Sequence, residues 1–214
     1  MGKRQDVPHP QFSEHLCIVL VNPMHDGNIG AVARSMLNFG IRDLRIVGKQ
    51  KPWSEEVRNR AKNAQTVLND ATLYVSFDEA VSDCSVVVGT SGKREGGNKT
   101  ELRHFVMPEE LPSRLDGIEG RVALVFGPEG KGLVNDQLRA CDLLVTIPSW
   151  EGYPILNLSH AVAILCYAWF DNSTEDAMPN TEERLISPEL RSRFRSEVKR
   201  LVASMPTKNH RRRG

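Results

Sequence analysis

The sequence lacks the features that mark membrane, secreted and metal-dependent proteins. No apolar run approaches the roughly 20 residues that a membrane-spanning helix needs, and no signal-peptide pattern is present. The cysteines lie far apart without a CxxC spacing, and the histidines match no metal-site spacing. We therefore expect a soluble, cytoplasmic protein with reduced core thiols and no metal. The cysteines are Cys17, Cys84, Cys141 and Cys166.

A charge excess of one sign is also lacking, because the formal net charge of the 214 residues is +1 at pH 7. This balance does not by itself indicate a nucleic-acid-binding protein. The distribution is uneven, however, since basic residues accumulate after Thr181 and end in the run from His210 to Arg213. Such a tail on a mildly acidic body indicates a polyanionic partner, although a plain solvated terminus has the same composition.

Short, continuous apolar runs are present, and they alternate with helical patterns. The runs lie at residues 16–21, 44–47, 73–75, 85–89, 122–126 and 143–147. Continuous apolar strands separated by helices are typical of a parallel sheet that is buried on both sides. The predicted fold class is therefore α/β, with a mainly parallel sheet and helices on both faces.

The composition changes after Phe170 and divides the chain. Residues 1–170 are expected to form one α/β domain, and the acidic, polar residues 171–186 a linker. Ser187-Pro188-Glu189 then suits a helix start, because serine caps a helix and proline fits its first turn. Within residues 187–214 we predict a basic C-terminal helix and a disordered tail.

Unusual loops follow three of the predicted strands: Thr90–Gly92, the glycine-rich Gly127–Gly132, and the proline-rich Ile147–Asn157. Ligands collect at the carboxyl ends of strands in open parallel sheets, so these loops are candidates for one shared pocket. Three unrelated turns are the alternative. The glycine-rich loop lacks the adjacent lysine and hydroxyl residue of a Walker loop, which argues against a small-molecule phosphate or nucleotide enzyme.

The first predicted helix carries two candidate polar residues, Asn28 and Arg34. Arg34 lies among Ala33, Val32 and Met36, so we expect it close to an apolar face. A partly buried arginine usually needs an anionic partner. A structural salt bridge and phosphate recognition are both consistent with this position.

Three segments together resemble a known family. Asn22–Met36, Phe126–Leu133 and Ile147–Ala163 occur in the order found in the SPOUT superfamily of RNA methyltransferases, and are similar to ribose 2′-O-methyltransferases of the TrmH and TrmJ type. The resemblance extends over about residues 15–170. Pro128 departs from the arginine of many TrmJ-like members, while TrmH-like members often have proline there.

The resemblance implies a deep trefoil knot near the C-terminal end of the fold, a homodimer, and S-adenosylmethionine as cofactor. The residues that match the cofactor-binding positions are Thr90, Ser91, Gly92, Gly127, Glu129, Gly130, Gly132, Ile147, Pro148, Leu156, Asn157 and Leu158. The residues that match the catalytic group or its supports are Arg34, Asn28, Glu129 and Ser159.

The activity implied by the resemblance is S-adenosylmethionine-dependent methylation of an RNA ribose 2′-hydroxyl. tRNA is the first expected substrate, with cytidine or uridine at position 32 of the anticodon loop, and rRNA is the second. A non-catalytic RNA-binding relative is the alternative class. Basic residues outside the pocket are candidate RNA contacts: Lys49, Lys51, Arg58, Arg60, Lys62, Lys93, Arg94 and Lys99.

Overall fold

The computed structural model describes residues 7–92 and 105–172, together with residues 193, 196–198, 200–201 and 204. The chain divides into two compact units, Met1–Glu175 and Asp176–Gly214. Nearly all of the predicted linker and much of the predicted basic helix and tail lie outside the described residues. Three candidate RNA contacts, Lys93, Arg94 and Lys99, lie outside them as well.

The first unit is built on a seven-stranded sheet in the order β3-β2-β1-β6-β4-β7-β5. Every strand pair is parallel, which confirms the predicted parallel α/β architecture. All six residues of β1 are buried, as expected for a strand covered on both faces. The strands are β1 Leu16–Val21, β2 Asp43–Val47, β3 Thr72–Tyr74, β4 Cys84–Thr90, β5 Phe105–Val106, β6 Arg121–Phe126 and β7 Leu143–Val145.

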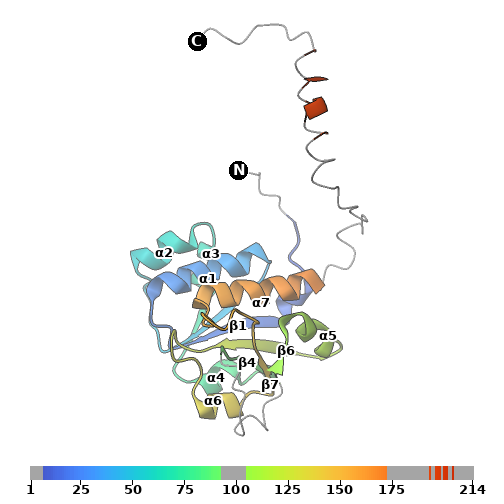
Figure 1. The fold of residues 1–214 in the computed structure, drawn as a ribbon. Coiled ribbons are helices and arrows are strands. Elements are labelled where there is room, and N and C mark those ends of the chain that lie inside the picture. Colours follow the sequence, from blue (N-terminus) through green and yellow to red (C-terminus); the bar gives the residue numbers. More distant parts are fainter. Residues whose placement is uncertain are drawn as a thin grey trace. The chain divides into compact units, whose positions relative to one another are not determined.

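Helices cover both faces of this sheet (Figure 1). One face packs against α1 Asp26–Asn38, α2 Glu55–Ala61, α3 Gln65–Asp70, α5 Leu111–Arg114 and α7 Leu158–Asn172. The other face packs against α4 Phe77–Val81 and α6 Asn135–Arg139. Short 3-10 helices occur at Gln11–Glu14 and Pro108–Glu110.

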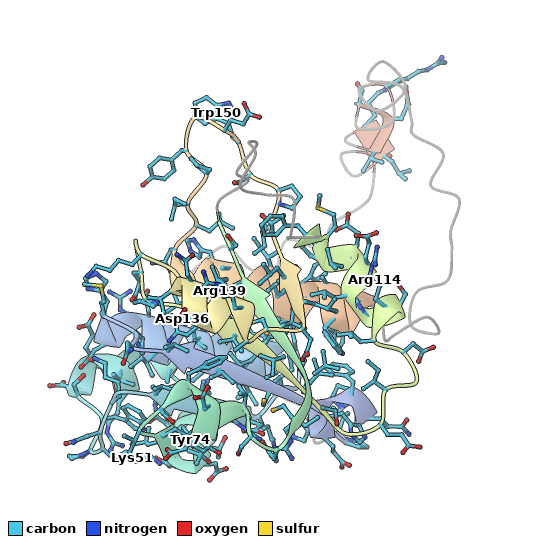
Figure 2. All side chains as sticks on the ribbon, turned by 90° about the horizontal axis from the view of Figure 1, so that it is seen from below. Lys51, Tyr74, Arg114, Asp136, Arg139 and Trp150 are labelled. Atoms are coloured by element: carbon cyan, nitrogen blue, oxygen red, sulfur yellow. The ribbon has the colours of Figure 1, made fainter. Side chains whose placement is uncertain are left out.

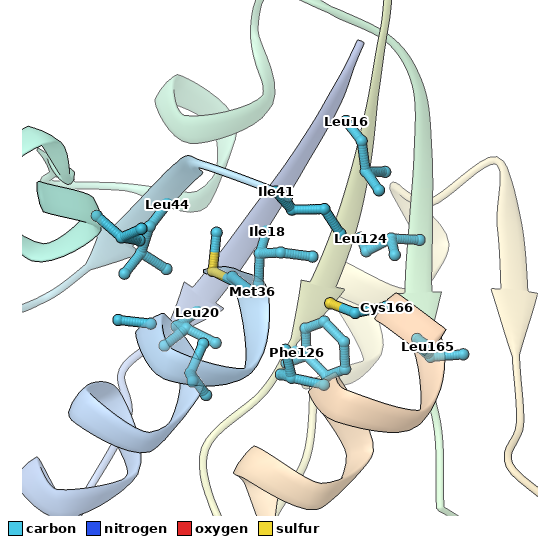
Figure 3. Close-up of a cluster of buried hydrophobic side chains, with 14 of the residues drawn as sticks. Leu16, Ile18, Leu20, Met36, Ile41, Leu44, Leu124, Phe126, Leu165 and Cys166 are labelled. Atoms are coloured by element: carbon cyan, nitrogen blue, oxygen red, sulfur yellow. The ribbon is translucent and has the colours of Figure 1, made fainter. Parts of the chain in front are cut away.

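The larger core lies between the sheet and the helices α1 and α7. Figure 3 shows Met36 of α1 and Cys166 of α7 over the side chains of Ile18 and Phe126. These four side chains are at most 2% exposed. The apolar runs of the sequence thus supply both the strands and the helix faces that cover them.

The local sequence explains the ends of two helices, whereas three short elements have no sequence pattern that predicts them. Ser54 caps α2, where its Oγ accepts a hydrogen bond from the Val57 backbone at 3.5 Å. Gly40 has a φ of +75°, a left-handed conformation that glycine often adopts just after the end of a helix such as α1. The sequence patterns did not predict α3, α6 or β5. The helix α6 buries none of its residues, so it has no apolar stripe that a sequence pattern reveals.

Arg45 connects the amino-terminal ends of β2 and β4 through Asp43 and Asp83. These ends lie on the side of the sheet opposite the predicted pocket. Its side chain is 3% exposed and donates to Asp83 Oδ2 at 2.9 Å, to Asp43 Oδ2 at 3.1 Å and to the Ala80 carbonyl at 2.8 Å. The hydrogen bond from Arg45 lowers the pKa of Asp83 to about 2. This buried guanidinium therefore has the charged and carbonyl partners that its burial requires.

All four cysteines are free thiols, of which Cys17 and Cys166 are buried, while Cys84 and Cys141 are half-buried. Within the described ranges, no three His, Cys, Asp or Glu side chains form a group that could hold a metal ion. No helix in the same ranges is long and apolar enough to cross a membrane.

Candidate functional site

The carboxyl ends of β6, β4 and β7 meet at one edge of the sheet, because these strands are neighbours in that order. The loops that follow them line one hollow of about 570 Å³. The pairing of β4 and β7 continues past Thr90, where the Ser91 backbone N–H donates to the Val145 carbonyl at 3.0 Å. The structure thus brings together the three loops that the sequence indicated.

The residues predicted to bind a cofactor line this hollow, except for Pro148 and Asn157. Pro148 is exposed, and Asn157 lies just before α7, where its side chain caps the helix. The lining combines apolar side chains with backbone and hydroxyl groups, as small-molecule sites do. It also includes residues that were not individually named as cofactor-binding candidates: Phe105, Phe126, Pro128, Lys131, Leu133, Asn135, Leu138, Arg139, Val145, Pro154, Ile155 and Ala161.

The glycine-rich loop is folded back on itself beside the hollow. The Gly132 backbone N–H donates to the Pro128 carbonyl at 2.8 Å, which closes the turn. A Cβ added to Gly127 would lie 2.2 Å from the Gly132 carbonyl carbon and 2.3 Å from the Leu133 nitrogen. Only glycine fits at position 127, because backbone atoms of the same loop occupy the space that a side chain would need.

Glu129 is held by the segment that begins the first helix. Its carboxylate accepts hydrogen bonds from the Asn28 side chain at 2.6 Å, the Met24 backbone at 2.6 Å and the His25 backbone at 3.3 Å. Burial alone would raise the pKa of Glu129, but these hydrogen bonds outweigh it and lower the pKa below its ordinary value. Glu129 is therefore ionised at neutral pH, and it faces the hollow.

A chain of side-chain hydrogen bonds runs from Glu129 to the start of α7. The Asn28 Oδ1 accepts from the Asn157 side-chain nitrogen at 3.1 Å. The Asn157 Oδ1 in turn accepts from the Ser159 backbone N–H at 2.9 Å and from the Ser159 hydroxyl at 2.7 Å. We call this the Glu129–Ser159 chain, with members Glu129, Asn28, Asn157 and Ser159. It joins one residue or more from each of the three motifs.

Asn28 and Ser159 are 8% and 9% exposed, and neither lines the hollow. Asn28 contacts Glu129 directly, whereas Ser159 is connected to it only through Asn157 and Asn28. The catalytic or supporting role that the resemblance implies for these two residues stays a prediction.

The loop from Ile147 to Asn157 forms one wall of the hollow and extends beyond it. Its turn is closed by the Ser149 hydroxyl, which donates to the Pro154 carbonyl at 2.8 Å, and by the Tyr153 backbone N–H, which donates to the Trp150 carbonyl at 3.0 Å. Figure 2 shows Trp150 at the end of this loop, away from the sheet. The loop therefore has a defined conformation, held by its own hydrogen bonds.

Arg34 is not part of the Glu129–Ser159 chain. Six residues along a helix advance about 9 Å and rotate by about 120° net, so Asn28 and Arg34 leave α1 in different directions. Arg34 is exposed and lines a second hollow with Arg58 and Lys62. The prediction that Arg34 is partly buried is wrong, and the structure gives it no salt bridge among the described residues.

The other candidate RNA contacts divide into two groups. Lys49 pairs with Asp26 at 3.0 Å, Arg60 pairs with Glu56 at 3.4 Å, and Lys51 donates to the carbonyls of residues 69 and 71. Arg58 and Lys62 have no such partner among the described residues and line the second hollow with Arg34.

Comparison with known proteins identifies the family. Residues 15–167 match the model of the SpoU rRNA Methylase family. The chain is 40% identical over 174 residues to the tRNA (cytidine-2′-O-)-methyltransferase TrmJ of Methanocaldococcus jannaschii, covering 81% of this chain and 75% of that one. It is 37% identical over 167 residues to the tRNA (cytidine/uridine-2′-O-)-methyltransferase TrmJ of Sodalis glossinidius, covering 75% and 64%. The chain thus spans less than two thirds of that bacterial relative.

Among solved structures, the crystal structure of TrmJ from Z. mobilis superposes with a TM-score of 0.66 at 34% identity, covering 72% of this chain and 67% of that one. The match to the family model includes all three motifs that line the hollow or support Glu129. The resemblance drawn from these motifs is confirmed: the chain belongs to the SpoU rRNA Methylase family.

Proposed function

We propose that this protein transfers a methyl group from S-adenosylmethionine to a ribose 2′-hydroxyl of tRNA. The observation that carries the proposal is the Glu129–Ser159 chain, which joins the three family motifs directly beside the hollow. Relatives that are 37–40% identical are named as tRNA 2′-O-methyltransferases. A purely RNA-binding relative would not need this hydrogen-bonded carboxylate in the wall of a ligand-sized hollow.

The hollow fits the cofactor in size and chemistry. Its volume of about 570 Å³ lies within the usual range for small-molecule sites. Apolar side chains of Ile147, Leu156 and Leu158 suit the adenine, while Thr90, Ser91 and the backbone of the glycine-rich loop offer polar groups. When bound, S-adenosylmethionine supplies an electrophilic methyl group on a sulfonium, so the reaction needs no metal.

The protein residues contribute positioning and charge. Glu129 stays ionised, and its charge fixes the orientation of the Asn28 amide, which in turn fixes that of Asn157. The Ser159 hydroxyl uses its hydrogen on Asn157, so toward any other group it can act only as an acceptor. A pre-oriented polar wall of this kind lowers the barrier, because little reorganisation is left for the reaction itself.

We further propose a homodimer in which Arg34 acts at the hollow of the partner copy. Arg34 does not line its own hollow, whereas the family resemblance assigns it a catalytic role. Apolar side chains on the neighbouring α7 are exposed, with Ile164 at 36% and Tyr167 at 54%. A guanidinium there can bind the phosphate next to the reacting ribose and stabilise the developing alkoxide, which suits a residue that stays protonated.

Methyl transfer from labelled S-adenosylmethionine into total tRNA and total rRNA tests the function. Label in tRNA that resists alkaline hydrolysis is expected, and mapping it tests position 32 and the choice of cytidine or uridine. Label confined to rRNA would show that the substrate is rRNA, the second candidate, and not tRNA. Absence of transfer together with absence of cofactor binding would overturn the proposal.

The Arg34→Ala variant is expected to lose methyl transfer by about 100-fold or more, because one preorganised charged donor is removed from the transition state. Its affinity for S-adenosylmethionine should stay unchanged, since Arg34 does not line the hollow.

Mixing Arg34→Ala with Gly127→Ala protein tests the partner assignment. If Arg34 acts on the partner copy, half of the dimers in an equal mixture are mixed, and each mixed dimer has one working site of two. The mixture should then restore about a quarter of the wild-type rate. If Arg34 acts within its own copy, no site is complete and no activity returns.

We also propose that residues 1–170 form the methyltransferase domain, residues 171–186 a linker, and residues 187–214 a basic helix and tail that contact RNA. A variant ending at residue 186 is expected to raise the KM for tRNA several-fold and to keep its affinity for S-adenosylmethionine. Replacing Arg211, Arg212 and Arg213 with glutamine separates the effect of charge from that of length. An unchanged KM in both variants would refute an RNA-binding role for this segment.

Two further proposals follow from family membership. We propose that the chain around residues 127–159 forms a deep trefoil knot. A crystal structure in which no segment of the chain passes through a loop formed by these residues would refute it. A cytoplasmic location is proposed because tRNA substrates are found there, and fractionation of cells tests it.

A further inference from the structure

A second hollow lies between α1, α2 and α3, and its volume is about 750 Å³. It shares no lining residue with the first hollow. Neither the family match nor the names of the relatives assign a role to it. Its lining residues are Arg34, Leu37, Asn38, Arg58, Asn59, Ala61, Lys62, Asn63, Ala64 and Gln65.

The lining of this second hollow is chemically one-sided. It contains three cations, Arg34, Arg58 and Lys62, four carboxamide side chains, and no carboxylate. Guanidinium groups and ammonium groups are donors only, so the three cations present only hydrogen-bond donors to the hollow. Such a set of donors recognises an anion with several oxygen atoms, most readily a phosphate group.

The three cations have no carboxylate partner among the residues that the structure describes. The contrast with nearby basic residues is clear, because Lys49 pairs with Asp26 and Arg60 pairs with Glu56. Like charges that face one hollow repel each other, and an anion bound between them removes this repulsion. The unpaired state of Arg34, Arg58 and Lys62 is therefore suited to an external anion.

The backbone that carries two of these cations is fixed. The Gln65 side-chain nitrogen donates to the Arg58 carbonyl at 2.8 Å and to the Lys62 carbonyl at 2.9 Å. This double hydrogen bond holds the last turn of α2 against the start of α3. Arg58 reaches the second hollow from α2, and Lys62 reaches it from the residue that follows this helix, where the backbone φ is +50°.

We infer that the second hollow binds the phosphodiester backbone of the RNA substrate through Arg58 and Lys62, next to Arg34. The inference rests on the proposed function, which supplies the polyanion. Phosphate contacts position a nucleic acid without reading its bases. The hollow would therefore set where the RNA strand lies relative to Arg34, and hence which ribose reaches a methyl-transfer site.

The double variant Arg58→Gln/Lys62→Gln tests this inference without changing Arg34. At low salt we expect it to bind tRNA roughly tenfold more weakly and to show a matching increase in the KM for tRNA. The slope of log K against log salt concentration should become shallower by about 1.4, because each phosphate contact to a single strand contributes about 0.7. The dissociation constant of S-adenosylmethionine reports whether the first hollow is intact.

A matched control is Arg42→Gln/Arg114→Gln, which removes the same charge from two exposed cations outside both hollows. It should bind tRNA with nearly the wild-type affinity and salt slope. Equal losses in the two double variants would mean that only overall charge matters, and would overturn the inference. Thermal unfolding of each variant checks that a loss of binding is not a loss of fold.

Inorganic phosphate and tripolyphosphate serve as probes for a small-anion site. If the Arg58→Gln/Lys62→Gln variant loses affinity for tripolyphosphate but binds tRNA as the wild type does, the hollow holds a small anion and the RNA inference is wrong. The binding readout is independent of turnover. A wild-type protein that binds tRNA through this hollow without methylating it would refute the proposed function and keep the inference.

Discussion

The Gly127→Ala variant is expected to lose methyl transfer and measurable binding of S-adenosylmethionine, and to unfold more easily than the wild type. The added Cβ would lie 2.2 Å from the Gly132 carbonyl carbon and 2.3 Å from the Leu133 nitrogen. Both atoms belong to the backbone, so no side chain can rotate away to relieve the overlap. The loop must open instead, and this loop forms one wall of the hollow.

The size of the effect follows from where the movement has to occur. A shift of about 1 Å in groups that hold a reacting molecule can reduce a rate about 100-fold, even when the changed residue is not itself reactive. Overpacking of a well-packed region also costs about 1–3 kcal/mol of stability. Isothermal titration with S-adenosylmethionine and urea unfolding measure the two consequences separately.

Gly92→Ala is the matched control for this prediction, because it makes the same change in the same hollow. Among the residues that the structure describes, its added Cβ would meet only the Ile155 Cδ1 atom, at 3.1 Å. That atom is the end of a flexible side chain, so it can move by a few tenths of an ångström. Cofactor affinity within a few-fold of the wild type is expected. Full cofactor binding by Gly127→Ala would show that the loop is not as tightly folded as described.

The sheet could be predicted from the sequence, but the order of its strands could not. Apolar runs mark β1 and β6 clearly, yet nothing in either run indicates that they are neighbours. In the structure Leu16 pairs with Val122, more than a hundred positions away. Strand order in a parallel sheet depends on crossover connections and helix packing, which local periodicity does not report. The sheet order is nevertheless what brings the three loops to one hollow.

The Glu129–Ser159 chain could be predicted only through the family motifs. Its hydrogen bonds join residues 101 and 129 positions apart, and each residue alone has an ordinary local explanation. Asn157, for example, is a residue type that favours helix starts, and it caps α7 through the Ser159 backbone. Its second contact, to Asn28, depends on the packing of α1 beside α7.

Arg34 shows the opposite case, in which the local pattern was misleading. Its neighbours Ala33 and Met36 are fully buried, which suggested a partly buried arginine. Adjacent helical positions differ by about 100°, however, so a residue beside a buried one can face solvent. The second hollow could not be predicted from the sequence either, because the helix α3, which closes one side of it, was not predicted.

The Glu129→Gln variant is expected to reduce methyl transfer by about 100-fold, because the charge of Glu129 sets the direction of every hydrogen bond behind it. Three donors point at the carboxylate, from Asn28, Met24 and His25. A glutamine side chain keeps the shape but presents an NH₂ group on one side, where it meets a donor. Of these donors Asn28 is buried, and leaving its NH₂ group without an acceptor costs about 1–3 kcal/mol, so stability should fall as well.

The defect should extend along the chain of amides. If Asn28 turns its amide to accept a hydrogen bond from the NH₂ group introduced by the Glu129→Gln change, its own NH₂ group then faces the donor of Asn157. Glu110→Gln is the matched control, since Glu110 also accepts a backbone hydrogen bond, from Met107 at 2.9 Å, but its side chain is 44% exposed. Water can replace the lost acceptor there, and wild-type activity is expected.

The pH dependence of stability provides an independent check, and its sign is fixed by the lowered pKa of Glu129. An acid whose pKa is lower in the folded state stabilises the protein above its ordinary pKa, near 4.5 for glutamate, and loses this contribution as pH falls through the folded value. The stability gap between the wild type and Glu129→Gln should therefore be full at pH 7 and shrink below about pH 4.5. A gap that stays constant down to acid pH would mean that shape at position 129, and not charge, holds Asn28 in place.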